Sequence, residues 1–164
     1  MKRTILIILS VIALAQIGYA VDERDEMGLR EFLLNDGFST YAQTNEICYI
    51  AFGAVQGTNA FETIYTDPPD SFLLRFEGRH FSVKKASQYP YPRREERVSV
   101  PNNPLTGIPD GIYTVEIIEW IDGTTAKVRY SIYRKPLWGS AYEAIAEKND
   151  GQWHIKQHGM MTET

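Results

Sequence analysis

The last third of the chain shows a clear alternation of apolar and polar residues. A period of two is typical of strands that bury one face and expose the other. The alternation covers residues 112–120, 126–133 and 142–148, and it resumes around Trp153 and Ile155. Asp-Gly pairs separate the first run from the second and the third from the last, and they favour tight hairpin turns. The pattern predicts four antiparallel strands in a meander.

Two helices are predicted before this meander. The first covers residues 22–35, where four acidic residues suit the positive end of a helix and apolar residues then recur at helical spacing. Asn35-Asp36-Gly37 predicts its end. The second helix is short, begins after Pro68-Pro69 and ends at Gly78. Their apolar faces can cover one face of the sheet.

The remaining segments complete one domain. Residues 47–52 and 81–87 predict further strands, and residues 53–59 predict a loop. Residues 89–111 carry five prolines, which remove backbone donors and predict a long, partly rigid loop. We expect a single α+β domain over residues 21–164, with an antiparallel meander sheet of about four to six strands packed against one long and one short N-terminal helix.

The first twenty residues have the character of an export signal. Lys2 and Arg3 are basic, residues 5–17 are almost wholly apolar, and Gly18-Tyr19-Ala20 places small residues where a signal peptidase reads them. The alternative is an uncleaved membrane anchor, but the apolar run is shorter than the ~18 residues that span a bilayer. We expect cleavage after Ala20 and a soluble mature protein, periplasmic or extracellular, without membrane insertion.

The charge of the chain argues against one class of partner. The sequence has 17 basic and 21 acidic residues and a formal net charge of −4. Removal of the expected signal would bring the net charge to about −6. Because nucleic-acid binding needs a basic face, no nucleic-acid partner is expected.

Cys48 is the only cysteine, which excludes an intramolecular disulfide. It lies in the apolar run 47–52, where a free thiol behaves as a small hydrophobic side chain. Catalytic use would require a nearby base and a lowered pKa. We favour a buried structural thiol.

The closing sequence Asp150-Gly151-Gln152-Trp153-His154-Ile155, which follows the long meander, resembles the end of NTF2-like and cystatin-like α+β domains. Those folds wrap a curved antiparallel sheet around a helix and often finish with a tight turn, Gly-x-Trp and an apolar residue. The resemblance covers about a third of the chain and implies a fold but no activity. The segment from Pro68-Pro69-Asp70-Ser71 to Lys84-Lys85-Ala86-Ser87 also resembles small uncharacterised exported bacterial proteins.

Two of the three histidines lie in the last predicted strand. On a regular strand His154 and His158 point to the same side but lie roughly 13 Å apart, too far to share a metal ion. Trp153 and Ile155 then occupy the opposite face. No HExxH or CxxC spacing supplies further ligands. We interpret both histidines as solvent-facing or rim residues, with a metal-binding or catalytic role as the alternative, and expect no metal site.

Glu116 is the candidate general base. If it points inward together with Ile118 and Trp120, burial would raise its pKa and make it a base in a pocket. If Tyr113 and Val115 form the buried face instead, Glu116 is solvated. We favour the second interpretation.

Ser82 and Lys85 match the S-x-x-K spacing in which a lysine activates a serine nucleophile. That chemistry requires a helix, whereas this segment predicts a strand that places the two residues on opposite faces. No catalytic residue and no cofactor are predicted.

The loop that begins at Tyr89 is the candidate binding surface. Tyrosine and arginine often anchor interfaces, and alternating prolines reduce the entropy lost when a loop is immobilised. The predicted binding residues are Tyr89, Tyr91, Arg93, Arg94 and Arg97. The alternative is a solvated turn whose glutamates pair with the arginines and whose tyrosines pack on their own loop.

Three functions remain open at this point. We favour an exported, non-enzymatic binding or accessory module that contacts a protein partner in the cell envelope through this loop. The alternative is a small-molecule-binding or enzymatic domain with a pocket between the sheet and the first helix, using Glu116 or a histidine as a base. A structural role in the envelope is the third. A deep pocket that encloses Glu116 or a histidine would favour the second.

Overall fold

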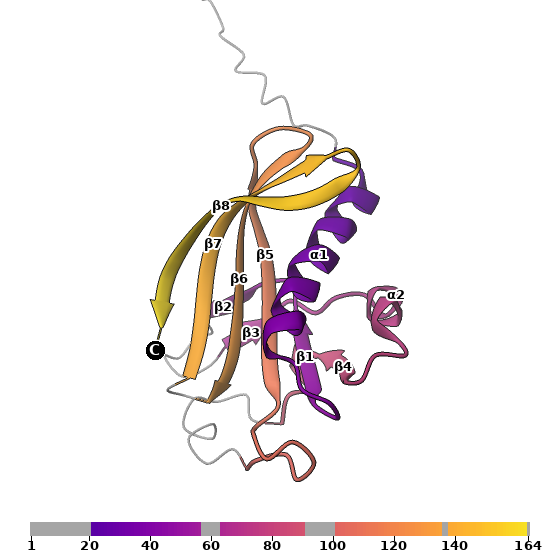
Figure 1. Cartoon of the computed structure of the whole chain (residues 1–164), viewed down its shortest axis with the longest axis vertical. Coiled ribbons are helices and arrows are strands. Elements are labelled where there is room, and N and C mark those ends of the chain that lie inside the picture. The colour runs from indigo at the N-terminus through magenta and orange to yellow at the C-terminus, as the bar shows by residue number, and fades with distance from the viewer. Residues whose placement is uncertain (1–20, 57–62, 91–100, 136–137, 164) are drawn as a thin grey trace, which may run out of the picture.

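The computed structural model describes residues 21–56, 63–90, 101–135 and 138–163, so the expected export signal lies outside the described residues. Figure 1 shows the long helix α1 lying across one face of the sheet that contains the long C-terminal strands. The helices are α1 (Glu23–Tyr41) and α2 (Asp70–Leu73), with 3₁₀ turns at Leu74–Phe76 and Ala86–Gln88. The strands are β1 (Ile47–Ala51), β2 (Ala54–Gln56), β3 (Thr63–Tyr65), β4 (Ser82–Lys85), β5 (Gly111–Trp120), β6 (Thr125–Lys135), β7 (Trp138–Asn149) and β8 (Gln152–Glu163).

The main sheet has six strands in the order β4-β1-β5-β6-β7-β8. From β5 to β8 each strand pairs antiparallel with the next, which confirms the predicted meander and the α+β class. At the other edge β1 runs parallel to both β4 and β5. The prediction of a wholly antiparallel sheet is therefore wrong for β1 and β4. Parallel neighbours need long crossovers, and the long segments on either side of β4 supply them.

A small separate sheet was not predicted. β2 and β3 pair antiparallel with each other, and β2 lies inside the segment 53–59 that was expected to be a loop. Val55 and Ile64 face each other in this pair and are both exposed. Because each strand has only three residues and buries little, its apolar pattern is too short to stand out in the sequence.

α1 is longer than predicted, since it continues through Asn35-Asp36-Gly37 to Tyr41. Leu33, Leu34 and Phe38 of this helix are all buried. Packing of this face against the sheet outweighs the local preference of Asn, Asp and Gly for a helix end. Among the described residues, neither helix combines the length and the apolar character that a bilayer-spanning segment requires.

The second helix begins after Pro68-Pro69, as predicted, and passes into a 3₁₀ turn before Gly78, which has a φ of 77°. Its buried aromatic residues join it to the rest of the core. The ring of Phe72 lies 4.8 Å from that of Phe52, and the ring of Phe76 lies 5.4 Å from that of Phe38. α2 therefore packs beside α1, at the end of the sheet where β1 lies (Figure 1).

One continuous core fills the space between α1 and the sheet. The buried side chains Leu29, Leu33, Leu34 and Phe38 of α1 face those of Cys48, Ile50, Tyr113, Val115, Val128 and Ile132. Each large side chain that is fully buried contributes about 1.5–3 kcal/mol relative to leaving it exposed. The burial of Cys48 confirms the prediction of a structural thiol.

The sheet curls around the helix at its far end. Lys148, at the end of β7, forms an ion pair of 2.6 Å with Asp25 near the start of α1. A Cβ atom added to Gly28 of α1 would lie 3.7 Å from Nε1 of Trp153, at the start of β8. Figure 1 shows the hairpin between β7 and β8 bending over the N-terminal half of α1. The candidate site lies against the C-terminal half of the helix.

Candidate functional site

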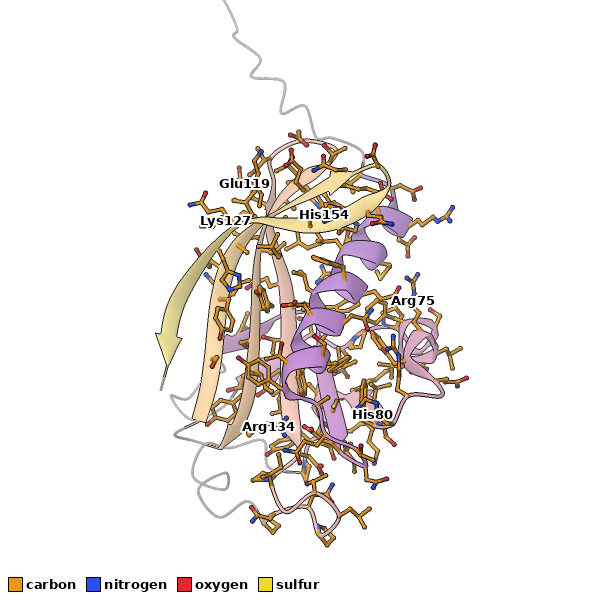
Figure 2. All side chains as sticks on the ribbon, viewed as in Figure 1. Arg75, His80, Glu119, Lys127, Arg134 and His154 are labelled. Carbon is orange, nitrogen blue, oxygen red and sulfur yellow. The ribbon has the colours of Figure 1, made fainter. Side chains whose placement is uncertain are left out.

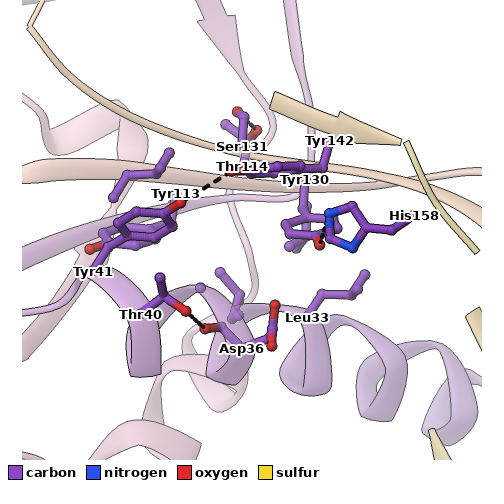
Figure 3. A pocket seen from close by; sticks show the side chains of 14 residues that line it. Leu33, Asp36, Thr40, Tyr41, Tyr113, Thr114, Tyr130, Ser131, Tyr142 and His158 are labelled. Atoms are coloured by element: carbon purple, nitrogen blue, oxygen red, sulfur yellow. Dashed lines mark hydrogen bonds between the residues drawn. The ribbon is translucent and has the colours of Figure 1, made fainter. Parts of the chain in front are cut away.

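A cavity of about 260 Å³ lies between the C-terminal half of α1 and the face of the meander that packs on this helix (Figure 3). We call it the tyrosine pocket, because Tyr41, Tyr113, Tyr130 and Tyr142 line it. Its lining also includes the side chains of His158 and Asp36. The pocket is therefore built from α1 and from three strands that are consecutive in the meander but far from α1 in the sequence, with β8 closing one side.

The helix contributes an apolar wall with a polar rim. Leu33 and Gly37 are one turn apart and face the sheet, and Thr40 and Tyr41 follow on the next turn. Gly37 leaves room beside the ring of Tyr113, because an added Cβ atom would lie 3.7 Å from that ring. Figure 3 shows the carboxylate of Asp36 projecting from α1 toward the space next to Tyr130 and His158.

The sheet contributes a wall of aromatic rings. Tyr130 of β6 and Tyr142 of β7 are directly opposite each other in the ladder, and their rings stack with centroids 5.3 Å apart. The hydroxyl of Tyr142 shares a hydrogen bond of 3.2 Å with that of Tyr41. This contact ties the end of α1 to the middle of the sheet and places two hydroxyl groups at the edge of the pocket.

His158 belongs to this wall, which corrects the prediction that it shares a face with His154. The pairing of β7 with β8 shifts by one residue, because Ala146 pairs with Ile155 while Ile145 pairs with Gln157. The unpaired Lys156 forms a β-bulge, and a bulge reverses which residues face the core. His158 therefore lies on the same face as Trp153, and His154 lies on the other face. Both histidines are exposed, which confirms their interpretation as solvent-facing or rim residues.

His158 makes close contacts with two tyrosines. Its Nε2 atom shares a hydrogen bond of 3.2 Å with the hydroxyl of Tyr130. Its ring lies edge-on to that of Tyr142, with centroids 4.9 Å apart. The imidazole thus has one nitrogen held by Tyr130 and a fixed orientation toward the pocket.

The surroundings of Tyr130 keep its hydroxyl neutral. Burial is the main cause that raises the pKa of Tyr130 to about 12, and the negative charge of Asp36 adds to it. A phenol with such a pKa remains protonated at neutral pH and acts as a hydrogen-bond donor or acceptor. Asp36 is the only Asp, Glu, Lys or Arg residue in the lining, and its carboxylate forms no ion pair within the described residues.

A buried ion pair closes one end of the pocket behind Tyr113. Nη1 of Arg134 lies 2.6 Å from Oε1 of Glu46, and the side chain of Glu46 is fully buried while that of Arg134 is 6 % exposed. Arg134 also donates to the hydroxyl of Tyr113 at 3.0 Å and to the carbonyl of Tyr41. Burial, followed by the neighbouring Cys48, raises the pKa of Tyr113 well above its usual value. The network holds the end of α1, β5 and β6 together.

Of the predicted loop residues, the structure describes only Tyr89, which does not line the tyrosine pocket. Tyr89 is only 5 % exposed, and its ring packs on that of Tyr49 with centroids 5.0 Å apart. Tyr91, Arg93, Arg94 and Arg97 lie outside the described residues. Protein binding by this loop stays a prediction, but Tyr89 contributes its ring to a second buried cluster in this conformation.

The other candidates do not converge on the pocket. Glu116 lies on the outer face, where its carboxylate is 3.2 Å from Nη1 of Arg129, which confirms the solvated interpretation. Lys85 forms an ion pair of 2.7 Å with Asp70, on a strand as predicted, and Ser82 is exposed. Within the described residues there is no group of three or more His, Cys, Asp or Glu side chains that could hold a metal ion.

Sequence reasoning overlooked the tyrosines of the pocket. Tyr130 follows the apolar Val128 by two positions, and Tyr142 precedes Ala144 by two, so the alternation already placed both on the core-facing side. The alternation along the strands could therefore have identified these two tyrosines. No such pattern pointed to Asp36 and Tyr41, because the predicted helix ended before Tyr41.

Comparisons with protein-family models, curated proteins and solved structures found no match for this chain.

Proposed function

We propose that this protein binds a small organic molecule in the tyrosine pocket. The observation that supports this most directly is a cavity of about 260 Å³ with apolar and aromatic walls, in which hydroxyl groups, an imidazole and a carboxylate converge. Binding sites for small molecules are mostly apolar, with a few well-placed polar groups. An apolar cavity of about 150 Å³ accepts benzene, so this pocket suits a ligand of roughly ten non-hydrogen atoms.

Binding is favoured over catalysis by the state of the polar groups. The hydroxyl of Tyr130 stays protonated at neutral pH because burial raises its pKa to about 12, so it is a poor proton donor for chemistry. The nearest nitrogen of His158 is engaged with this same hydroxyl. These groups are suited to orienting a polar atom of a ligand by hydrogen bonds.

We also propose that the protein is exported. The basic and apolar pattern of residues 1–20 supports export, and the mature chain would then meet its ligand outside the cytoplasm. A helix lying against a curling meander sheet is also the arrangement expected from the NTF2-like and cystatin-like resemblance. We propose that the chain is related to these folds, and this relationship implies no particular ligand.

The test uses meta-tert-butylphenol, a neutral probe of suitable size with one hydroxyl group. We expect it to bind the mature protein and to shift the NMR signals of Tyr130, Tyr142 and His158. Gly37→Leu adds a side chain next to the ring of Tyr113 and should abolish binding, because it fills the pocket. Gly28→Leu changes a glycine of the same helix outside the pocket lining and should leave binding intact.

Two results would contradict the proposal. One is the absence of any shift at the pocket residues with millimolar probe. The other is equal binding by the two leucine variants, both shown to be folded by circular dichroism. Either result would again favour the binding of a protein partner through the loop that begins at Tyr89.

A further inference from the structure

The tyrosine pocket has an unbalanced charge. Among the described residues that line it, Asp36 is acidic and none is a lysine or an arginine. Two buried guanidinium groups lie near the pocket, and both are paired: Arg134, behind Tyr113, lies 2.6 Å from Glu46, and Arg30 lies 2.8 Å from Glu26. Within the described residues, no ion pair neutralises Asp36. The lining therefore presents one net negative charge to whatever enters.

The aromatic rings add to this preference. A tyrosine ring has negative charge density over its faces, and a cation within about 6 Å of the centroid is attracted to it. The rings of Tyr130, Tyr142 and His158 form one cluster, with centroids between 4.9 and 5.9 Å apart. A positively charged group seated among them would meet several such rings together, and desolvation in the pocket strengthens the attraction.

The negative charge at the mouth of the pocket also favours a positively charged ligand. Asp36 is exposed, so it stands at the mouth of the cavity and not at its floor. The whole chain has a net charge of −4, and the field of an acidic protein raises the local concentration of cations. The apolar side chains Leu33 and Ile132 line the rest of the cavity and suit a hydrocarbon or aromatic body.

We propose that the ligand of the tyrosine pocket is a small organic cation, an ammonium group on a compact apolar or aromatic body. The ammonium group lies beside Asp36 and against the rings of Tyr130 and Tyr142, and the apolar body lies between α1 and the sheet. This inference rests on the proposed function, because it names the chemical class of a ligand that the pocket must first be able to bind.

The experiment compares two molecules of the same shape. The probes are meta-hydroxyphenyltrimethylammonium, which is positively charged, and meta-tert-butylphenol, in which carbon replaces the charged nitrogen. Affinities are measured by calorimetry and by NMR titration at low salt with the mature protein. We expect the cation to bind about tenfold more tightly than its neutral isostere, a difference between that of an exposed and that of a fully desolvated cation–π contact.

The substitution Asp36→Asn removes the negative charge of the carboxylate and keeps nearly the same side-chain shape. This variant should lower the affinity for the cation by about three- to tenfold and leave that for the neutral probe unchanged. Because Asp36 is exposed, the variant should fold, and thermal unfolding checks this. Glu119→Gln removes the same charge from an exposed position outside the pocket lining and should leave both affinities unchanged (Figure 2).

The outcomes distinguish the two proposals. If neither molecule binds, the proposed function is wrong, and this inference is wrong with it. If both bind equally, or if the neutral probe binds more tightly, small-molecule binding stands and the preference for a cation is overturned. Equal losses in Asp36→Asn and Glu119→Gln would also overturn it, since the preference would then reflect only the net charge of the protein.

Discussion

The hydroxyl of Tyr130 lies 3.2 Å from Nε2 of His158, although the two residues belong to strands that are not adjacent. β7 runs between them and contributes Ala144, which pairs with both Val128 and His158. The small side chain of Ala144 leaves space for the two longer ones to meet above it. A hydrogen bond thus spans three strands on the core-facing side of the sheet and fixes the aromatic wall of the tyrosine pocket.

The energy of this contact can be measured by a double-mutant cycle. We expect Tyr130→Phe and His158→Ala to show a coupling of about 0.5–1.5 kcal/mol in the free energy of unfolding, which is typical of one hydrogen bond. Urea denaturation provides the measurement. His154→Ala, on the exposed face of the same strand, should change stability by less than about 0.5 kcal/mol. A cycle with no coupling would mean that the contact does not form in solution.

Gly37 offers a stability prediction that is independent of any ligand. It lies within α1, and an added Cβ atom would make an ordinary contact of 3.7 Å with Tyr113. Gly37→Ala should therefore stabilise the protein by about 0.5–1 kcal/mol, because alanine favours the helix more than glycine does. Thermal or urea unfolding tests this. A loss of stability would show that the helix does not extend through residue 37 as described.

The ion pair between Glu46 and Arg134 should be the most sensitive polar contact. Replacing only one partner leaves a buried charge without its counterion, and Arg134→Met should cost about 3–5 kcal/mol in the free energy of unfolding. Replacing both residues with methionine should cost less than this single change, since no charge is then left buried. The surface pair of Arg129 with Glu143 is the control.

Arg129→Met removes two solvent-accessible ion pairs, with Glu143 at 2.7 Å and with Glu116 at 3.2 Å, and should cost no more than about 1 kcal/mol. Urea denaturation of the three variants gives the comparison. Similar losses for Arg134→Met and Arg129→Met would contradict the buried geometry at Arg134.

The thiol of Cys48 should be inert in the folded protein. It is fully buried, and burial followed by the nearby Glu46 raises its pKa, so little of the reactive thiolate forms. We expect Ellman's reagent to label Cys48 only as fast as the protein unfolds. In a Cys48→Ala background, Ser39→Cys should react at once because position 39 is exposed. Rapid labelling of Cys48 in the native protein would argue against the described core.

Alkaline pH should weaken the fold through Tyr130. Its folded pKa, about 12, lies above the ordinary value of 10.0, so the neutral phenol contributes stability that is fully present below pH 10. That contribution is lost as the pH rises through about 12. We expect wild type and Tyr130→Phe to converge or cross in stability over this range, measured by urea unfolding at several pH values. Parallel pH profiles for the two proteins would show that Tyr130 is not buried.

Several features of the fold follow directly from local sequence patterns. The alternation in residues 112–155, with its Asp-Gly turns, determined the meander, because the period of two and the turn residues act over a few positions. Pro68-Pro69 likewise determined the start of α2, since a proline limits its own backbone and that of its neighbour. The apolar surroundings of Cys48 were enough to place it in the core.

Other features depend on partners that are distant in the sequence, and only the tertiary structure decided them. α1 passes through Gly37 because the burial of Phe38 against the sheet outweighs the local tendency to end the helix. The bulge at Lys156 depends on the register with β7, and that single shift turns His158 toward the core. The tyrosine pocket exists because the sheet packs Tyr130, Tyr142 and His158 against one helix, and side chains so far apart along the chain carry no local signal of their meeting.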